Sequence, residues 1–395
     1  MTNDPSCLAG RYAIVGVGEA GLGKAQPGDT ALSLQCRSAR DALLDAGLTL
    51  ADVDGVFAHW DDRANALLVS EYLGITPRYV DSTVVGGGSP LTHLIHAMAA
   101  IEAGLCSVAL VTYGSTQRLD HSRNRAGVIT DPRSPSGQFV APYGVLSPIS
   151  WYAMLSQQYL HRYQASAEDL GEVAINARRW AQLNSQATLR KPLTMEEYLA
   201  SPLISDPLRK ADICLVSDGA GALIVTKADH ARTLAKSPVF IRGFADTYRH
   251  HVTPFAVTDW LDPGVIGDCT ERALLMSGIT RSALSMVQIY DAFTINVLVA
   301  LEAMGFCAPG QAGAFLRSGI AAPGGALPVN TSGGGLAFNH SGQFGMQLMI
   351  ESVRQLRGEC GERQVANASS CLVQASGLLM SAFMSMVLAT EESDQ

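Results

Sequence analysis

The sequence predicts an α/β protein with a parallel sheet, organised as two halves of similar element order. Apolar runs typical of buried strands alternate with helix-like segments, and this order favours crossover connections between parallel strands. Hydrophobic residues make up 47% of the 395 residues and charged residues only 16%, so the chain can bury a large core. We expect an N-terminal half over residues 1–235 and a C-terminal half over residues 236–395, related by an internal duplication.

The N-terminal half opens with a strand at residues 11–17 and a helix at residues 29–48. Asp29 or Thr30 can cap this helix, and Gly47 ends it. The later elements continue the alternation of apolar runs and helix-forming segments. They are a strand at 53–59, a helix at 93–103, a buried strand at 107–113 (SVALVTY), and two apolar runs separated by a glycine turn at 211–226.

Residues 117–204 interrupt this alternation. They are richer in Arg, Gln, Ser, Pro and aromatic residues, and the pattern predicts two helices, at 149–163 and 167–184. We interpret this segment as an excursion from the sheet that builds a substrate tunnel or a partner surface.

The C-terminal half repeats the element order of the first. Its predicted elements are a strand at 239–242, a helix at 269–277, a strand at 286–290, a helix after Thr294, a glycine-rich loop at 333–335, a helix at 345–357 and a strand at 368–374.

Charge and composition exclude several classes of protein. The formal net charge is −8, which argues against a nucleic-acid binder because that function needs a basic face. The longest apolar runs are too short to span a bilayer, and no secretory signal is visible. The eight cysteines include no CxxC pair, so neither a disulfide framework nor a zinc ribbon is indicated. We expect a cytoplasmic protein with reduced thiols.

Residues 16–21 match the GxGxxG pattern of a dinucleotide site. That site needs a helix N-terminus facing the pyrophosphate, but here the next helix starts about eight residues too late. A flexible loop after the first strand is the better interpretation.

Three segments carry chemical information. Residues 84–90 (VVGGGSP) form a glycine turn before a helix, where backbone N–H groups can hold an anion or an oxyanion, although the glycines could also serve the turn geometry alone. Tyr290 and Asp291 follow a buried strand, and such strand ends carry reactive side chains. Residues 333–342 (GGGLAFNHSG) are a glycine loop with His340, a side chain suited to proton transfer near neutral pH.

These three segments, in this order, resemble the thiolase superfamily, specifically its sterol-carrier-protein/lipid-transfer-protein branch. Residues 217–222 (SDGAGA) resemble the family's SDGAAA segment, residues 288–294 its "LHDCF" motif, and residues 333–342 its "GGL…GHPxG" motif. The resemblance covers nearly the whole chain. It implies a five-layer α-β-α-β-α fold from two duplicated halves, a homodimer, and an acyl-CoA thioester as substrate with no cofactor.

The resemblance also suggests which residues form the site. The family's nucleophilic cysteine maps near Gly87, but residues 85–89 contain no cysteine. Within that turn we expect Gly87, Gly88 and Ser89 to bind substrate, with Ser89 open as a replacement nucleophile. Asp291 is a further candidate for substrate binding.

Three residues are candidates for catalysis. His340 matches the family's histidine, and Tyr290 takes the slot where many relatives carry His or Asn for an oxyanion hole. Cys371 falls near the second family cysteine, as a catalytic residue or as a buried structural thiol.

Without the cysteine no acyl-enzyme forms, and the remaining groups suit an aldol or retro-aldol step through a thioester enolate. The sequence is similar to thiolase-like aldolases of steroid side-chain degradation. We expect an acyl-CoA aldolase or lyase that cleaves a β-hydroxyacyl-CoA into a ketone or aldehyde and a shorter acyl-CoA. A thiolase-like acyltransferase with an unconventional nucleophile, or a non-catalytic subunit that binds a CoA thioester or lipid, are the alternatives.

Resemblance also implies a small partner with an OB fold and a zinc ribbon, so zinc is expected only in that partner. One departure concerns the acid–base pairing, because Phe338 and Phe344 stand where a second tyrosine could assist.

Overall fold

The computed structural model describes residues 8–59, 65–121, 131–145, 147–249 and 259–390. Eleven strands and thirteen α-helices are assigned within them. The strands are β1 Tyr12–Gly23, β2 Gly55–His59, β3 Tyr79–Asp81, β4 Val108–Ser115, β5 Leu203–Ser205, β6 Leu208–Arg209, β7 Asp218–Lys227, β8 Val239–Tyr248, β9 Met286–Ile289, β10 Ser370–Gly377 and β11 Ala382–Ala389. The helices are α1 Ala31–Ala46, α2 Asn65–Leu73, α3 Ser89–Glu102, α4 Pro135–Phe139, α5 Pro148–Tyr163, α6 Ala167–Gln182, α7 Met195–Leu199, α8 Ala228–Ala231, α9 Gly264–Ser277, α10 Thr294–Ala303, α11 Ala312–Arg317, α12 Gly334–Ala337 and α13 Gly345–Leu356.

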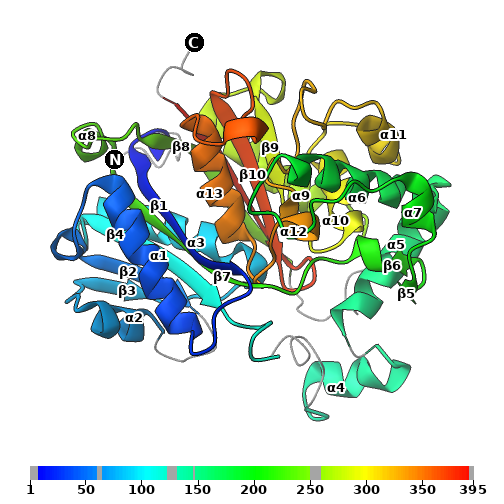
Figure 1. Cartoon of the computed structure of the whole chain (residues 1–395), viewed down its shortest axis with the longest axis horizontal. Coiled ribbons are helices and arrows are strands. Elements are labelled where there is room, and N and C mark those ends of the chain that lie inside the picture. Colours follow the sequence, from blue (N-terminus) through cyan, green and yellow to red (C-terminus); the bar gives the residue numbers. More distant parts are fainter. Residues whose placement is uncertain (1–7, 60–64, 122–130, 146, 250–258, 391–395) are drawn as a thin grey trace.

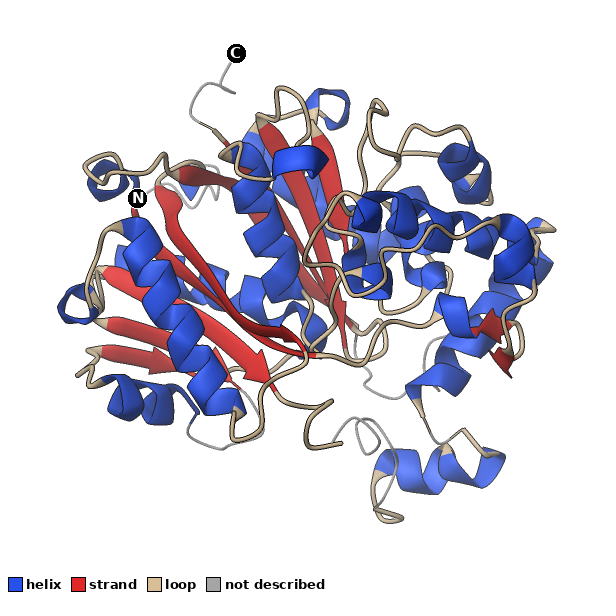
Figure 2. Cartoon of the chain, viewed as in Figure 1, coloured by secondary structure: helices blue, strands red, loops and turns tan. Residues whose placement is uncertain are grey.

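Nine strands form one mixed sheet in the order β3-β2-β4-β7-β1-β8-β11-β10-β9 (Figure 2). The N-terminal half contributes β1, β2, β3, β4 and β7, and the C-terminal half contributes β8, β9, β10 and β11. Val329 forms a parallel bridge with Val287 of β9. This bridge corresponds to the parallel pairing of β3 with β2 in the N-terminal half. Both halves therefore share one strand order, although the boundary expected at residue 235 stays a prediction.

The alternation of elements predicted a parallel sheet, but the sheet is mixed. β7 runs antiparallel to β4 and β1, and β11 runs antiparallel to β10 and β8. In the C-terminal half a tight hairpin connects β10 to β11, whereas in the N-terminal half residues 116–217 lie between β4 and β7.

Helices cover both faces of the sheet and fill the space between its two halves (Figure 1). α1 and α2 pack on the outer face of the N-terminal strands, while α9 and α10 lie beside the C-terminal strands. α3 and α13 contact each other and strands of both halves, so they form a central layer. This arrangement matches the expected five-layer α/β fold.

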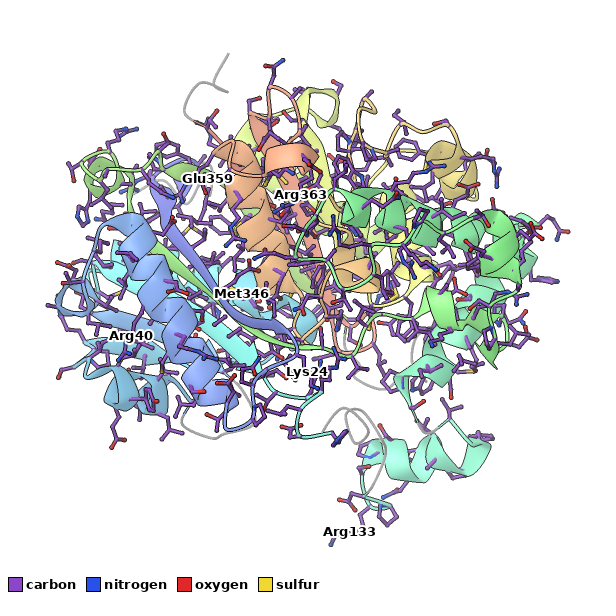
Figure 3. All side chains as sticks on the ribbon, viewed as in Figure 1. Lys24, Arg40, Arg133, Met346, Glu359 and Arg363 are labelled. Atoms are coloured by element: carbon purple, nitrogen blue, oxygen red, sulfur yellow. The ribbon has the colours of Figure 1, made fainter. Side chains whose placement is uncertain are left out.

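Two glycine motifs belong to strands, which corrects the sequence interpretation. Residues 16–21 lie inside β1 and not in a loop. A Cβ at Gly16 would lie 2.1 Å from Ala42 O, so glycine lets α1 pack directly on the strand backbone. Gly221, expected in a turn, lies inside β7, where a Cβ would meet Met346 of the central helix α13 at 2.5 Å (Figure 3).

The excursion over residues 117–204 contains α4 to α7, and the helices predicted at 149–163 and 167–184 correspond to α5 and α6. α6 and α7 pack together beside α10, α11 and α12, whereas α4 lies apart from the body of the molecule (Figure 1). The excursion therefore covers the part of the C-terminal half that holds the glycine loop.

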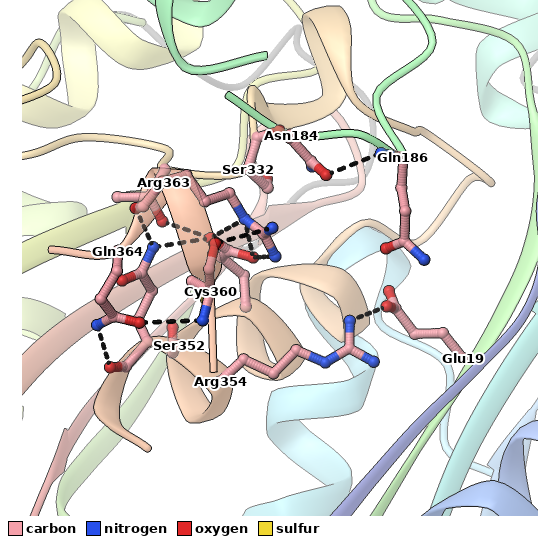
Figure 4. A network of polar contacts seen from close by, with 12 residues as sticks. Glu19, Asn184, Gln186, Ser332, Ser352, Arg354, Cys360, Arg363 and Gln364 are labelled. Carbon is pink, nitrogen blue, oxygen red and sulfur yellow. Dashed lines mark hydrogen bonds and ion pairs between the residues drawn. The ribbon is translucent and has the colours of Figure 1, made fainter. Parts of the chain in front are cut away.

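A buried polar network ties α13 to the strand that carries Tyr290. Gln288 of β9 donates to Thr331 Oγ1 at 2.8 Å, and Thr331 donates to Glu351 of α13 at 2.7 Å. Glu351 also forms an ion pair with Arg363 at 2.9 Å. Figure 4 shows Arg363 near the end of α13 and the ion pair of Arg354 with Glu19 of β1. These contacts hold the central helix in register with the strands on both sides.

Candidate active site

Tyr290 fills the space where the family resemblance places a nucleophile. It follows β9, its backbone N–H donates to Gln374 O at 3.0 Å, and the side chain is buried. A Cβ at Gly87 would lie 2.3 Å from both Cζ and Oη of Tyr290. No side chain larger than hydrogen fits at position 87 while the phenol stays in place. Glycine at this position is therefore the steric requirement for the tyrosine.

The Tyr290 hydroxyl points to the glycine loop, where Oη donates to Gly342 O at 2.8 Å. Its ring lies edge-on to the imidazole of His340, with ring centroids 5.7 Å apart. The Phe344 ring stacks on His340 with centroids 5.7 Å apart and lies edge-on to Tyr290 at 6.1 Å, so the three rings form a triangle. The structure thus brings Tyr290 and His340 together, and it places Phe344 beside both of them.

Asp291 holds the glycine loop against β9. Its buried carboxylate accepts hydrogen bonds from the N–H groups of Gly335 at 2.7 Å and Leu336 at 3.3 Å. Burial raises the pKa of Asp291 to about 7, and the two N–H donors oppose that rise. A Cβ at Gly335 would lie 2.8 Å from His340 Cδ2 and 3.1 Å from Asp291 Oδ1. Asp291 therefore shapes the loop that carries the histidine, while its predicted contact with substrate stays a prediction.

Helix α3 begins at Ser89, with Gly88 as its N-cap, directly after Gly87 in the chain. The Ser89 hydroxyl donates to Gly86 O at 2.7 Å and accepts from Val85 N–H at 2.9 Å, and the side chain is buried. At Gly88 a Cβ would lie 2.2 Å from Met384 Sδ. Ser89 uses its hydroxyl to close the turn over Gly86, which leaves it poorly placed as a replacement nucleophile.

The structure does not bring Cys371 to this cluster. It lies three residues before Gln374 on β10, so about 10 Å of strand separates it from the backbone contact of Tyr290. Its thiol is buried against Ser352 of α13 at 3.3 Å, and burial raises the pKa of this thiol to about 12. The sequence left two roles open for Cys371, a catalytic residue or a buried structural thiol. Its contacts favour the structural role.

Three further residues position the histidine loop, and sequence reasoning missed their role. Ser217 Oγ accepts from His340 N–H at 2.7 Å, and Gln117 Nε2 donates to His340 O at 3.0 Å. Tyr113 donates to Ser341 O at 2.8 Å. Ser217 stood in the quoted SDGAGA segment, but nothing in the sequence indicated which loop it would meet.

A pocket of about 880 Å³ borders the glycine loop through Leu336. Most of its lining is apolar and comes from α6, α7 and residues 210–216. Arg178, Glu197 and Lys210 also line it. Backbone hydrogen bonds from Cys214 to Ala292 O and from Leu215 to Gly335 O connect this wall to the segment that follows Tyr290. The pocket therefore lies between the excursion and the glycine loop.

Fold and site together define a thiolase-like enzyme whose nucleophile slot is occupied by a phenol. The C-terminal part matches the family "Thiolase C-terminal domain-like" over residues 248–390. A steroid side-chain-cleaving aldolase of Thermomonospora curvata is 32% identical, over 95% of this chain and 99% of that protein. The 17-hydroxy-3-oxo-4-pregnene-20-carboxyl-CoA lyase of Mycobacterium tuberculosis is 33% identical, over 94% of this chain and 100% of that protein.

Solved structures agree with these sequence relatives. A chain of the Ltp2-ChsH2(DUF35) aldolase superposes with a TM-score of 0.88 at 30% identity, over 97% of this chain and 99% of that one. Human mitochondrial 3-ketoacyl-CoA thiolase in complex with CoA superposes with a TM-score of 0.68 at 16% identity, over 97% of this chain and 98% of that one, a likeness of fold alone. The chain belongs to the thiolase superfamily, in the branch of carbon–carbon lyases that its two bacterial relatives represent.

Within the described residues, no helix is long and apolar enough to cross a membrane. In that same part of the chain no group of three or more His, Cys, Asp and Glu side chains could hold a metal ion. The expectations of a cytoplasmic location and of a cofactor-free reaction stay predictions.

Proposed function

We propose that the chain cleaves a β-hydroxyacyl-CoA with a bulky apolar group on its β-carbon, such as a steroid nucleus, into a ketone or aldehyde and a shorter acyl-CoA. A base takes the proton of the β-hydroxyl, whose oxygen becomes a carbonyl as the Cα–Cβ bond breaks. The bond electrons pass to the thioester as an enolate, which then takes a proton at Cα. No covalent bond to the protein is needed in any of these steps.

The observation that carries this proposal is the phenol of Tyr290 over Gly87. Thiolysis needs an activated nucleophilic side chain at that place, whereas Tyr290 Oη, which donates its hydrogen bond to Gly342 O, is placed for proton transfer and hydrogen bonding. Tyr290 would exchange its hydrogen bond to Gly342 O for one to the substrate's β-oxygen. His340 would hold the thioester oxygen or return the proton.

The 880 Å³ pocket supports a large substrate. Its apolar lining suits an apolar chain or the pantetheine arm, and Arg178 and Lys210 offer cationic groups for phosphate. We infer that the acyl-CoA enters between the excursion and the glycine loop.

Mass spectrometry of one incubation tests the proposal. The protein, co-expressed with any small zinc-ribbon protein encoded beside it, is mixed with a branched β-hydroxyacyl-CoA, with and without free CoA. We expect a ketone and a shortened acyl-CoA without added CoA, and no mass shift on the protein. Products that require free CoA, or an acyl mass on the protein, would establish the acyltransferase alternative. Binding without turnover would establish the non-catalytic alternative.

A partner subunit is also part of the proposal, and the ChsH2(DUF35) component of the similar Ltp2-ChsH2(DUF35) aldolase supports it. The excursion offers a surface for such a partner: Phe139 at the end of α4 is 59% exposed and Tyr143 is 80% exposed. We expect the double substitution of Phe139 and Tyr143 by Asp to abolish co-elution with a DUF35-type partner. Leu44→Asp, on the 81% exposed Leu44 of α1, is the matched control and should leave co-elution intact.

The expected homodimer remains a proposal as well. Strand β3 lies at the outer edge of the sheet and pairs with β2 on its inner side. An edge strand presents unpaired N–H and C=O groups that can pair with another strand. Sedimentation analysis of the purified chain, with and without its partner, tests this expectation.

A further inference from the structure

The hairpin turn between β10 and β11 has a strained backbone. Leu378, Leu379 and Met380 are consecutive non-glycine residues with φ of 51°, 55° and 62°. Ser381 N–H donates to Gly377 O at 3.1 Å, which closes one left-handed turn. This conformation brings Cβ close to the following carbonyl, so glycine adopts it without the penalty that other residues incur. Three large apolar side chains here cost stability that glycines would not.

The turn lies against the glycine segment of the site. A Cβ at Gly377 would be 2.2 Å from Val85 O and 2.9 Å from Gly87 N, and a Cβ at Gly86 would be 2.7 Å from Leu378 N. The two backbones are therefore in direct contact. Gly87 also contacts the phenol of Tyr290, so the strained turn packs against the segment that borders the candidate catalytic groups.

The three side chains of the turn do different things. Met380 is buried and belongs to the main core, and Leu379 packs partly buried against it. Leu378 is 38% exposed, and Val84, also next to the glycine segment, is 54% exposed. Core packing explains the two buried side chains, but it does not explain a leucine held in a left-handed conformation and exposed beside the site. Strain of this kind concentrates at functional sites, where the surroundings over-determine it.

We propose that Leu378 is a specificity-determining residue, whose side chain contacts the bulky apolar group on the β-carbon of the acyl-CoA. The inference rests on the proposed function and deepens it, since it assigns the wall that this group meets. The backbone of Leu378 lies against Gly86 beside the site, and in this proposal the bulky group covers the exposed surface of the leucine when bound.

Two variants separate the side chain from the strain. Leu378→Ala removes the apolar contact and keeps the left-handed alanine strained, whereas Leu378→Gly removes both. We expect both variants to lower kcat/KM about 10-fold for a branched, bulky β-hydroxyacyl-CoA and to leave a short β-hydroxyacyl-CoA within about twofold of the parent. Only the glycine variant should raise the melting temperature, by about 2 °C. Leu275→Ala, on the 78% exposed Leu275 of α9, is the control and should leave the ratio of the two substrates unchanged.

An unchanged substrate ratio in both variants would overturn the inference, and so would a change in the glycine variant alone, which would assign the effect to the backbone. Titration calorimetry with the same two acyl-CoAs gives a second readout that does not need turnover. Failure of the parent protein to cleave either substrate would refute the proposed function. In that case a selective loss of affinity for the bulky acyl-CoA would still support the contact at Leu378, and equal affinities would refute it.

Discussion

A single methyl group at position 87 should disable the enzyme. In Gly87→Ala the new Cβ would lie 2.3 Å from Cζ and Oη of Tyr290, although carbon atoms in contact are normally about 3.5–4.0 Å apart. The phenol must therefore move by about 1.2 Å or more. A displacement of that size is larger than the tolerance in length and angle of the 2.8 Å hydrogen bond from Tyr290 Oη to Gly342 O, so we expect this bond to be lost.

Misplacement of a reacting group by about 1 Å can cost on the order of 100-fold in rate, so we expect at least that loss in kcat/KM. Overpacking should also lower the free energy of unfolding by about 1–3 kcal/mol. Steady-state kinetics and urea unfolding measure the two effects. Combining Gly87→Ala with Tyr290→Ala should remove the clash but not restore activity, because the second substitution returns the space without the hydroxyl and leaves a cavity of its own.

Gly267→Ala is the matched control. Residue 267 lies in helix α9, and a new Cβ there would lie 3.1 Å from Ala303 O. Activity near that of the parent is expected for this variant. Parent-like kcat/KM in Gly87→Ala would refute the reasoning, because Tyr290 would then not need its observed position.

Three further outcomes follow from the site. The pKa of Asp291, raised by burial, predicts that its contribution to stability is present below about pH 4 and is lost as pH rises through about 7. Asp291→Asn should flatten the dependence of unfolding free energy on pH in that range, and an unflattened profile would count against this assignment. Cys371→Ala should keep turnover. In the folded parent Cys371 should not react with iodoacetamide, because its thiol is buried and burial raises its pKa to about 12. Inactivation of the folded parent by alkylation of Cys371 would contradict this. Gln117→Leu should lower kcat more than it raises KM by releasing the His340 carbonyl, and a pure KM effect would argue against a positioning role.

The motif at residues 16–21 shows the limit of inferring function from spacing. Its glycines suggested a loop, but they lie in strand β1. Glycine is needed at Gly16 and Gly18 because α1 packs so closely that a Cβ at either position would meet the backbone of the helix. The SDGAGA segment contributed to the family resemblance, yet its Ser217 positions His340 from 123 residues away in the chain. Contacts of that separation leave no periodic signal in a sequence.

Local patterns in the chain were enough to predict the α/β class and the thiolase resemblance and to select Tyr290 and His340 as candidates, because alternating apolar runs and short ordered motifs are local properties. They also excluded a cysteine from the nucleophile slot. Three-dimensional packing was needed to show that Tyr290 enters that slot over Gly87, that Asp291 holds the glycine loop, and that Cys371 faces α13 instead of the site. These facts depend on how elements from both halves pack against one another, and packing is set by distances between residues that are far apart in sequence.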